Sequence, residues 1–237
     1  MLYESASEAL RLPSSLKRAR ACVSEESGSG MKYLCLVFLL ASWSVRSESS
    51  CDTKTDPPFL VNATIEIMAG SNRKWEINKE TGELEWEGAV SGLGGRVVDY
   101  LGYPANYGYI EETLSSEAEG GDGDALDILV LGDQVARAEQ VAVRPLAVLR
   151  LLDQSEIDDK IIAVQMSGPF SSLTSMSGLR QKYPKAAEII ALWFANYKRQ
   201  GGLEVLEWGD EAVARSLISA ALCEYARQGT NGAYKPR

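Results

Sequence analysis

The sequence predicts an α+β chain, with a barrel core of short strands first and peripheral helices last. Two observations carry this prediction. Short apolar, β-rich runs recur at close spacing between residues 59 and 164, which is typical of barrels. Apolar residues at helical spacing are found only near the end of the chain. Strands that precede helices, rather than alternate with them, indicate an α+β architecture.

The predicted strands begin with residues 59–68, in which Glu66 stands between two isoleucines. The runs 74–78 and 83–86 alternate in polarity across a turn at 79–82 and therefore predict a hairpin. Segment 102–109 is aromatic and rich in turn residues. Further strands are predicted at residues 96–100, 128–131, 141–152 and 161–164.

The predicted helices cover residues 184–200 and 211–227. Apolar positions near 3.6-residue spacing indicate the buried face of each helix, and glycines at 201, 202 and 229 supply the stops. The expected core positions are Ala187, Ile190, Ala191, Phe194 and Tyr197 in the first helix, and Val213, Leu217, Ala220 and Ala221 in the second.

Residues 1–50 are predicted to be a non-globular extension, and residues 51–237 a single domain. Within the extension, residues 31–49 resemble a secretory signal: Met31-Lys32, then a short apolar core, then small polar residues. Such a signal normally begins a chain, so residues 1–30 suggest an upstream start. The competing interpretation of the apolar core is a buried helix.

Composition excludes several classes of protein. The formal net charge of -9 argues against a nucleic-acid partner, because binding a phosphate backbone needs a basic surface. No apolar run reaches the roughly 18 residues of a membrane span, so no stable membrane anchor is expected. The chain contains no histidine, which excludes imidazole metal sites. After signal cleavage Cys51 and Cys223 would remain, either bridged or as two unrelated thiols.

Three carboxylates, Asp122, Asp124 and Asp127, lie within six residues, directly before the apolar run 128–131. Like charges this close disfavour folding unless a cation lies among them. Oxygen ligands select hard ions such as Mg²⁺, Mn²⁺ or Ca²⁺. The alternative is a solvated acidic turn. An EF-hand loop is excluded, because Leu126 occupies a ligand position and Asp127 stands where that loop needs glycine.

Three motifs in order resemble the family I soluble inorganic pyrophosphatases. They are Tyr103-Pro104-x-Asn106-Tyr107-Gly108-Tyr109, Asp122-Gly123-Asp124-x-x-Asp127 and Asp153-(x)₄-Asp158-x-Lys160, within a similarity that spans about residues 64–198. The resemblance implies a five-stranded OB-like barrel with flanking helices. It also implies hydrolysis of pyrophosphate to two phosphates, with several Mg²⁺ ions per site and Mn²⁺ as a substitute. Family precedent further implies a cytoplasmic homo-oligomer, a hexamer if the protein is bacterial, whereas the signal-like segment points to export to the periplasm or outside the cell.

The resemblance also implies roles for individual residues. Asp124 matches the general base that takes the proton of the attacking water. The implied ligands of the tight metal sites are Asp122, Asp127 and Asp158, and those of the additional ions are Glu66 and Asp153. The phosphates would be gripped by Lys74, Arg96, Lys160 and Lys198 with the hydroxyls of Tyr107 and Tyr197, and Tyr103 and Glu76 would line the same cavity. Of these side chains, Tyr107, Arg96 and Lys160 are grouped with Asp124 as catalytic.

The chain departs from the family pattern at two sites of chemical interest. Ala125 replaces the usual proline after the second aspartate. The phosphate-binding arginine has no partner at the ungapped position, which falls on Gly88, and Arg96 is our substitute across an insertion at 88–95. A second insertion, 116–121, lengthens the loop before the aspartates.

Two other functions remain as alternatives. The displaced arginine and the signal-like segment are compatible with a barrel that binds metal or phosphate without catalysis. An oligonucleotide-binding barrel is disfavoured by the acidic charge balance.

Overall fold

The computed structural model describes residues 58–78, 81–90, 93–198 and 203–230. These residues belong to one compact unit, Ser49–Arg237. The signal-like segment 31–49 and Cys51 lie outside the described residues, so the division between extension and domain stays a prediction. In the part of the chain that is described, no helix has both the length and the apolar character needed to cross a membrane.

Five strands pair in a ring, which confirms the expected barrel-like core. The order around the ring is β1 (Val61–Ile67), β4 (Asn106–Ile110), β5 (Asp127–Leu131), β8 (Lys160–Gln165) and β6 (Gln140–Asp153), and β6 returns to pair with β1. Only the β5–β8 pair is parallel among these pairings. Because β1 and β6 pair with each other, neither presents a free edge to the other, and the ring of five strands is closed.

Alternate residues of the ring strands enter two different hydrophobic cores. In β5, Leu129 packs in the core that contains Phe194 of helix α2 (Ala186–Asn196). Its neighbour Ile128 packs in the core that contains Ile218 of helix α3 (Glu211–Thr230). The apolar run that follows the acidic cluster is therefore buried on both faces, which holds Asp127, the first residue of β5, on a rigid support.

Helices α2 and α3 confirm the two predicted helices, with one difference in α3. The face of α3 that is buried consists of Ala214, Ile218 and Ala221, whereas the predicted core residues Val213 and Ala220 are exposed. Small residues dominate this helix, so apolar spacing alone left its inward face ambiguous by one position.

The elements that were not predicted include one short helix and one strand of the large sheet. Helix α1 (Met176–Lys182) is only seven residues long, too short for a helical period to be visible. Its N-cap is Ser175, whose side chain accepts a hydrogen bond from Gly178 N at 3.1 Å. Strand β9 (Glu204–Gly209) pairs with β6. It begins with Glu204, and Glu207 interrupts its apolar residues, so its pairing depends on tertiary contact rather than on local pattern.

Two local predictions were wrong. Residues 96–100 do not form a strand: the described part of this segment makes one isolated bridge, Arg73 with Val97. Conversely, residues 106–110 form β4 rather than a turn. Gly108 permits this, because a Cβ there would overlap the Thr64 carbonyl oxygen on the neighbouring strand β1.

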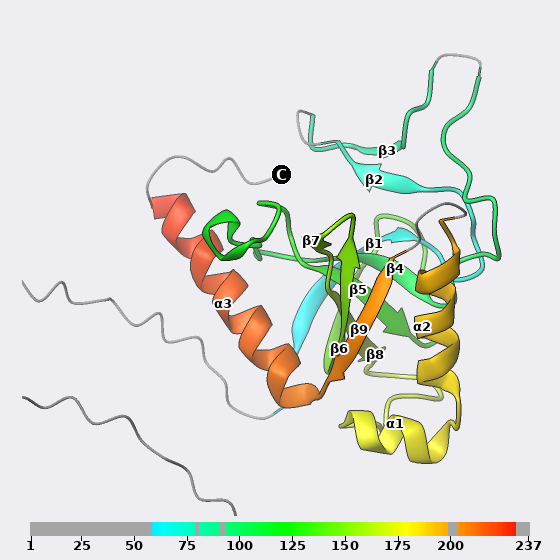
Figure 1. Ribbon diagram of the computed structural model, residues 1–237, viewed down its shortest axis with the longest axis vertical. Coiled ribbons are helices and arrows are strands. Elements are labelled where there is room, and N and C mark those ends of the chain that lie inside the picture. Colours follow the sequence, from blue (N-terminus) through cyan, green and yellow to red (C-terminus); the bar gives the residue numbers. More distant parts are fainter. Residues whose placement is uncertain (1–57, 79–80, 91–92, 199–202, 231–237) are drawn as a thin grey trace, which may run out of the picture. The chain divides into compact units, whose positions relative to one another are not determined.

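The hairpin prediction is confirmed as a separate two-stranded sheet, β2 (Trp75–Ile77) with β3 (Leu84–Trp86). Figure 1 shows it projecting from the ring, with the segment after β3 running back toward α2. A turn at residues 154–155 folds strand β7 (Glu156–Ile157) back on the end of β6, and Asp158 directly follows β7, two residues before β8 begins. The hairpin and the ends of β5, β6 and β8 therefore surround the residues singled out from the sequence.

Candidate active site

Lys160 is a buried cation at the first position of β8, with only 3% of its surface exposed. Its Nζ lies 2.6 Å from Asp127 Oδ2 and also bonds Asp158 Oδ1. Burial alone would lower the pKa of Lys160, but the two carboxylates outweigh it and raise the pKa above its usual value. The parallel pairing of β5 with β8 produces this arrangement, because it aligns the starts of the two strands.

A cavity of about 210 Å³ brings Asp122, Asp127 and Asp158 to one lining, together with residues of α3. Within the acidic loop, Asp124 N donates a hydrogen bond to Asp122 Oδ1 at 2.9 Å. Over the described ranges no three carboxylates stand close enough to form a ready-made metal site. The residue types nevertheless fit a hard divalent cation, since Asp122, Asp127 and Asp158 line one cavity and the single positive charge of Lys160 offsets only one of the three negative charges.

The same cavity is lined by Cys223 of α3, which is disulfide-bonded. The sequence left open whether Cys223 is a free thiol, and the structure resolves that half of the question. The identity of its partner falls outside the described residues.

Three tyrosines form an aromatic wall next to the charged groups. The ring centroids of Tyr103 and Tyr107 are 5.1 Å apart, and Tyr197, which directly follows α2, stacks on Trp193 at 4.7 Å. Burial raises the pKa of each of the three hydroxyls, that of Tyr197 to about 12. All three therefore remain protonated donors at neutral pH.

The charged groups that shift the pKa values of these tyrosines lie in the same site. Asp127 and Asp158 act on the pKa of Tyr107. The pKa of Tyr197 responds to four nearby charges, those of Lys160, Asp158, Arg96 and Asp153. Arg96, Lys160 and the carboxylates of Asp127, Asp153 and Asp158 therefore lie near one aromatic wall, although they come from separate segments of the chain.

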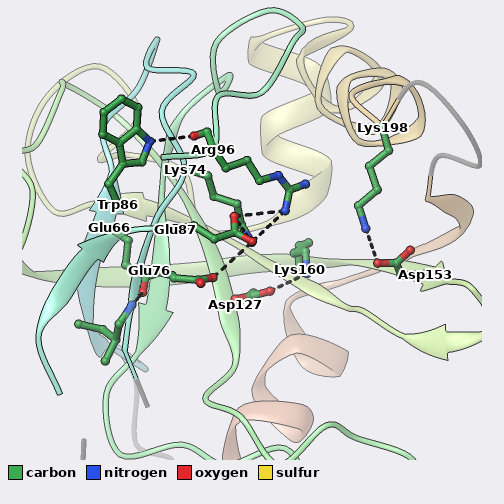
Figure 2. A network of polar contacts seen from close by, with 11 residues as sticks. Glu66, Lys74, Glu76, Trp86, Glu87, Arg96, Asp127, Asp153, Lys160 and Lys198 are labelled. Atoms are coloured by element: carbon green, nitrogen blue, oxygen red, sulfur yellow. Dashed lines mark hydrogen bonds and ion pairs between the residues drawn. The ribbon is translucent and has the colours of Figure 1, made fainter. Parts of the chain in front are cut away.

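Glu66 is a buried carboxylate on β1, with 8% of its surface exposed. Its Oε1 accepts a hydrogen bond from Ile77 N of the hairpin at 2.9 Å (Figure 2). Burial raises its pKa to about 8, and Asp127 and Glu76 nearby add to the shift. Glu66 therefore does not face solvent, and its carboxylate is costly to desolvate.

Asp153 and Lys198 form an ion pair that joins the end of β6 to the segment after α2 (Figure 2). The Asp153 Oδ1 atom is buried without a hydrogen-bond donor. Lys198 also lies 5.8 Å from the centroid of the Tyr197 ring. The two residues place one carboxylate and one ammonium at the edge of the aromatic wall.

Lys74 and Arg96 meet on a carboxylate that the sequence did not single out. Figure 2 shows Glu87 between them, with Lys74 Nζ 3.2 Å from Glu87 Oε2 and Arg96 Nη1 3.0 Å from Glu87 Oε1. Lys74 also lies 3.4 Å from Glu76. A signal for Glu87 was present, because it immediately precedes the insertion that displaces the arginine, but only the fold shows that it contacts both cations.

Comparison with known proteins agrees with this geometry. A sequence model of inorganic pyrophosphatases matches residues 63–226, which include every site residue named above. The chain belongs to the inorganic pyrophosphatase family. It is 34% identical over 173 residues to the inorganic pyrophosphatase of Leifsonia xyli, covering 71% of this chain and 97% of that protein. The Caulobacter vibrioides inorganic pyrophosphatase is 31% identical, with 72% of this chain and 92% of that protein covered.

Solved structures of the pyrophosphatase family share the fold. The inorganic pyrophosphatase of Helicobacter pylori superposes with a TM-score of 0.60 at 28% identity, over 70% of this chain and 94% of that chain. The ring of five strands is thus the OB-like barrel fold of pyrophosphatases, as the sequence resemblance implied.

Proposed function

We propose that this protein hydrolyses inorganic pyrophosphate to two phosphates in a Mg²⁺-dependent reaction. The observation that carries the proposal is Lys160, buried between Asp127 and Asp158 beside Tyr107, in a chain that belongs to the pyrophosphatase family. Hydrolysis of a small polyanion needs an activated water and neutralisation of the leaving phosphate. Carboxylates that bind cations, next to fixed ammonium and guanidinium groups, meet both needs.

The metal ligands in this proposal are carboxylates from four segments. Asp122, Asp127 and Asp158 hold the tightly bound ions, and Glu66 and Asp153 hold the additional ions. Oxygen-only ligands select Mg²⁺, with Mn²⁺ as a substitute. Bound there, the ions lower the pKa of the attacking water and neutralise phosphate charge.

Asp124 is the proposed general base. It lies in the loop between Asp122 and Asp127, and Asp122 accepts a hydrogen bond from its backbone N–H. A carboxylate must lie within hydrogen-bond reach of the attacking water to take its proton.

The phosphate groups are gripped by Lys74, Arg96, Lys160 and Lys198, and Tyr107 and Tyr197 donate hydrogen bonds from hydroxyls that stay protonated. Arg96 takes the place of the family's phosphate-binding arginine, whose ungapped position falls on Gly88. Its charge lowers the pKa values of Tyr103 and Tyr197, which supports this, since the guanidinium must then lie near these two tyrosines.

The test is phosphate release from pyrophosphate by the purified full-length chain, with Mg²⁺, with EDTA and with Ca²⁺. We expect Mg²⁺-dependent release that Ca²⁺ suppresses. Asp124→Asn should lower kcat by roughly 100-fold or more, the usual loss when a general base is removed. The matched control is Asp99→Asn, an exposed aspartate in the 93–101 loop, which should retain activity.

Two results would oppose the proposal. Equal turnover by the wild type and Asp124→Asn would remove Asp124 as the base. Mg²⁺-dependent binding of pyrophosphate by the folded wild-type protein without phosphate release would favour the alternative of a catalytically weak binding barrel.

We further propose that the protein is a homo-oligomer, a hexamer if it is bacterial. Exposed apolar side chains support this, because contiguous apolar surface commonly marks an interface. Leu101 is 69% exposed and Ile189 and Leu192 of α2 are 59% and 61% exposed. The Leu101 carbonyl oxygen accepts a hydrogen bond from Trp193 Nε1 at 2.9 Å, which brings the loop to this helix. Light scattering after gel filtration measures the mass.

The compartment remains a choice between the cytoplasm, by family precedent, and export. The disulfide at Cys223 supports export, because disulfides persist mainly in oxidising compartments. Fractionation of cells that express a C-terminally tagged chain separates the two.

A further inference from the structure

We propose that Glu87 is a positioning residue that holds Arg96 at the phosphate site across the insertion 88–95. The inference deepens the proposed function and rests on it. At the ungapped position of the family's phosphate-binding arginine, directly after Glu87, this chain has Gly88. The guanidinium must therefore be supplied from another position in the sequence.

The backbone returns to Glu87 after the insertion. Arg96 N donates to the Glu87 carbonyl oxygen at 2.7 Å, and Lys74 N donates to the Arg96 carbonyl oxygen at 3.1 Å. Trp86 Nε1 donates to the same Arg96 oxygen at 2.8 Å. Gly95 makes the close approach possible, because a Cβ there would lie 2.6 Å from the Trp86 ring and 2.7 Å from the Glu87 carbonyl oxygen.

These backbone contacts fix the Cα of Arg96 but not its long side chain. The Glu87 carboxylate supplies that restraint: both of its oxygens lie near the same nitrogen, Nη1, at 3.0 and 3.2 Å. Figure 2 shows the guanidinium meeting Glu87 through this nitrogen, with its other side turned away from the carboxylate. Donors therefore remain for a phosphate while the side chain is held.

Glu87 differs from the other carboxylates that pair with the proposed phosphate-binding cations. Asp127 and Asp158 pair with Lys160, and Asp153 pairs with Lys198, but all three are also proposed metal ligands. Glu87 has no such second role. Lys74 has Glu76 as another partner, whereas Glu87 is the one carboxylate among the described residues that pairs with Arg96.

The consequence is a specific dependence of substrate binding on Glu87. Without the carboxylate, Arg96 regains rotamer freedom and must be ordered again by each substrate molecule. Ordering one long side chain on binding weakens affinity by roughly three- to tenfold. An interaction made equally in the ground state and the transition state changes KM and leaves kcat near its original value.

The experiment compares the wild type with Glu87→Gln, Glu87→Asp, Arg96→Ala and the double variant Glu87→Gln/Arg96→Ala, all as full-length chains. KM and kcat are measured for pyrophosphate with Mg²⁺. The Kd of Mg²⁺-imidodiphosphate, which reports binding without turnover, is measured by calorimetry. Glu85→Gln is the matched control, because Glu85 is an exposed residue of the same hairpin that pairs with Asn78 instead.

We expect Glu87→Gln to raise both KM and Kd by roughly three- to tenfold with kcat nearly unchanged, and Glu87→Asp to restore part of the loss. In the Arg96→Ala background, Glu87→Gln should add less than about twofold, because the positioned group is gone. Glu85→Gln should behave as the wild type does.

An unchanged or lowered Kd in Glu87→Gln would overturn the proposal, as would an equal loss with and without Arg96. A fall in melting temperature that accounts for the lost binding would reduce Glu87 to a structural role. If the wild type releases no phosphate, the proposed function fails, while the imidodiphosphate series still decides whether Glu87 acts through Arg96.

Discussion

Replacing Glu66 by glutamine should stabilise the metal-free protein at neutral pH. In the folded chain Glu66 has a pKa of about 8, against an ordinary value of 4.5. The folded state therefore keeps the proton over a range in which the unfolded chain loses it. The contribution of Glu66 to the free energy of unfolding is fully present below pH 4.5. It falls as the pH rises above that value and stops falling above pH 8.

The magnitude follows from this window. At pH 7 the unfolded group is 2.5 pH units above its pKa, and each unit corresponds to about 1.4 kcal/mol, so the wild type loses about 3 kcal/mol. The substituted glutamine cannot ionise, and its side-chain oxygen can still accept the hydrogen bond from Ile77 N. For a domain of this size, about 3 kcal/mol corresponds to roughly 6 to 12 °C in melting temperature.

The assay is thermal unfolding of both proteins in EDTA at pH 5, 6, 7 and 8. The gap in melting temperature should be small at pH 5 and widen up to pH 8. Glu85→Gln, on the exposed face of the hairpin, should show no such trend. If the melting temperatures of the wild type and Glu66→Gln differed by the same amount at every pH from 5 to 8, Glu66 would ionise normally. Its burial would then not disfavour the charge.

Two further predictions concern stability. Asn106→Ala should lower the free energy of unfolding, measured in urea, by about 3 kcal/mol or more. The fully buried side-chain amide accepts hydrogen bonds from Ala69 N and Val135 N and donates one to Asp133 O, and each of these groups would lose a partner. The exposed control Asn196→Ala should cost under about 1 kcal/mol, and similar losses for both variants would contradict the reasoning. Cys223→Ser should lower the free energy of unfolding by about 2 to 4 kcal/mol and abolish the effect of dithiothreitol on the melting temperature, whereas a wild type insensitive to dithiothreitol would oppose a stabilising disulfide.

Much of the fold could be predicted because its strands are marked by local pattern. The runs that became β1, β5, β6 and β8 are apolar and β-branched, and burial on both faces preserves that signature. Strand β9 could not be predicted in this way, since its glutamates carry no such signal and its position depends on the edge of β6. The failed strand at 96–100 has the opposite cause: suitable residues lacked a neighbouring strand to pair with along their length.

The chemical types of the site residues were determined by the sequence, because spacing within short motifs survives whatever the rest of the chain does. The aspartates at 122, 124 and 127, the absence of histidine and the order of the motifs already pointed to oxygen-ligated cations and a phosphate substrate. Tertiary structure alone decided which charges meet. The parallel pairing of β5 with β8 puts Lys160 between Asp127 and Asp158, and the return of the chain after residue 95 puts Arg96 on Glu87. Asp127 and Lys160 belong to different strands, and Glu87 and Arg96 lie on either side of the 88–95 insertion, so no local pattern records a distance that only strand pairing and loop closure create.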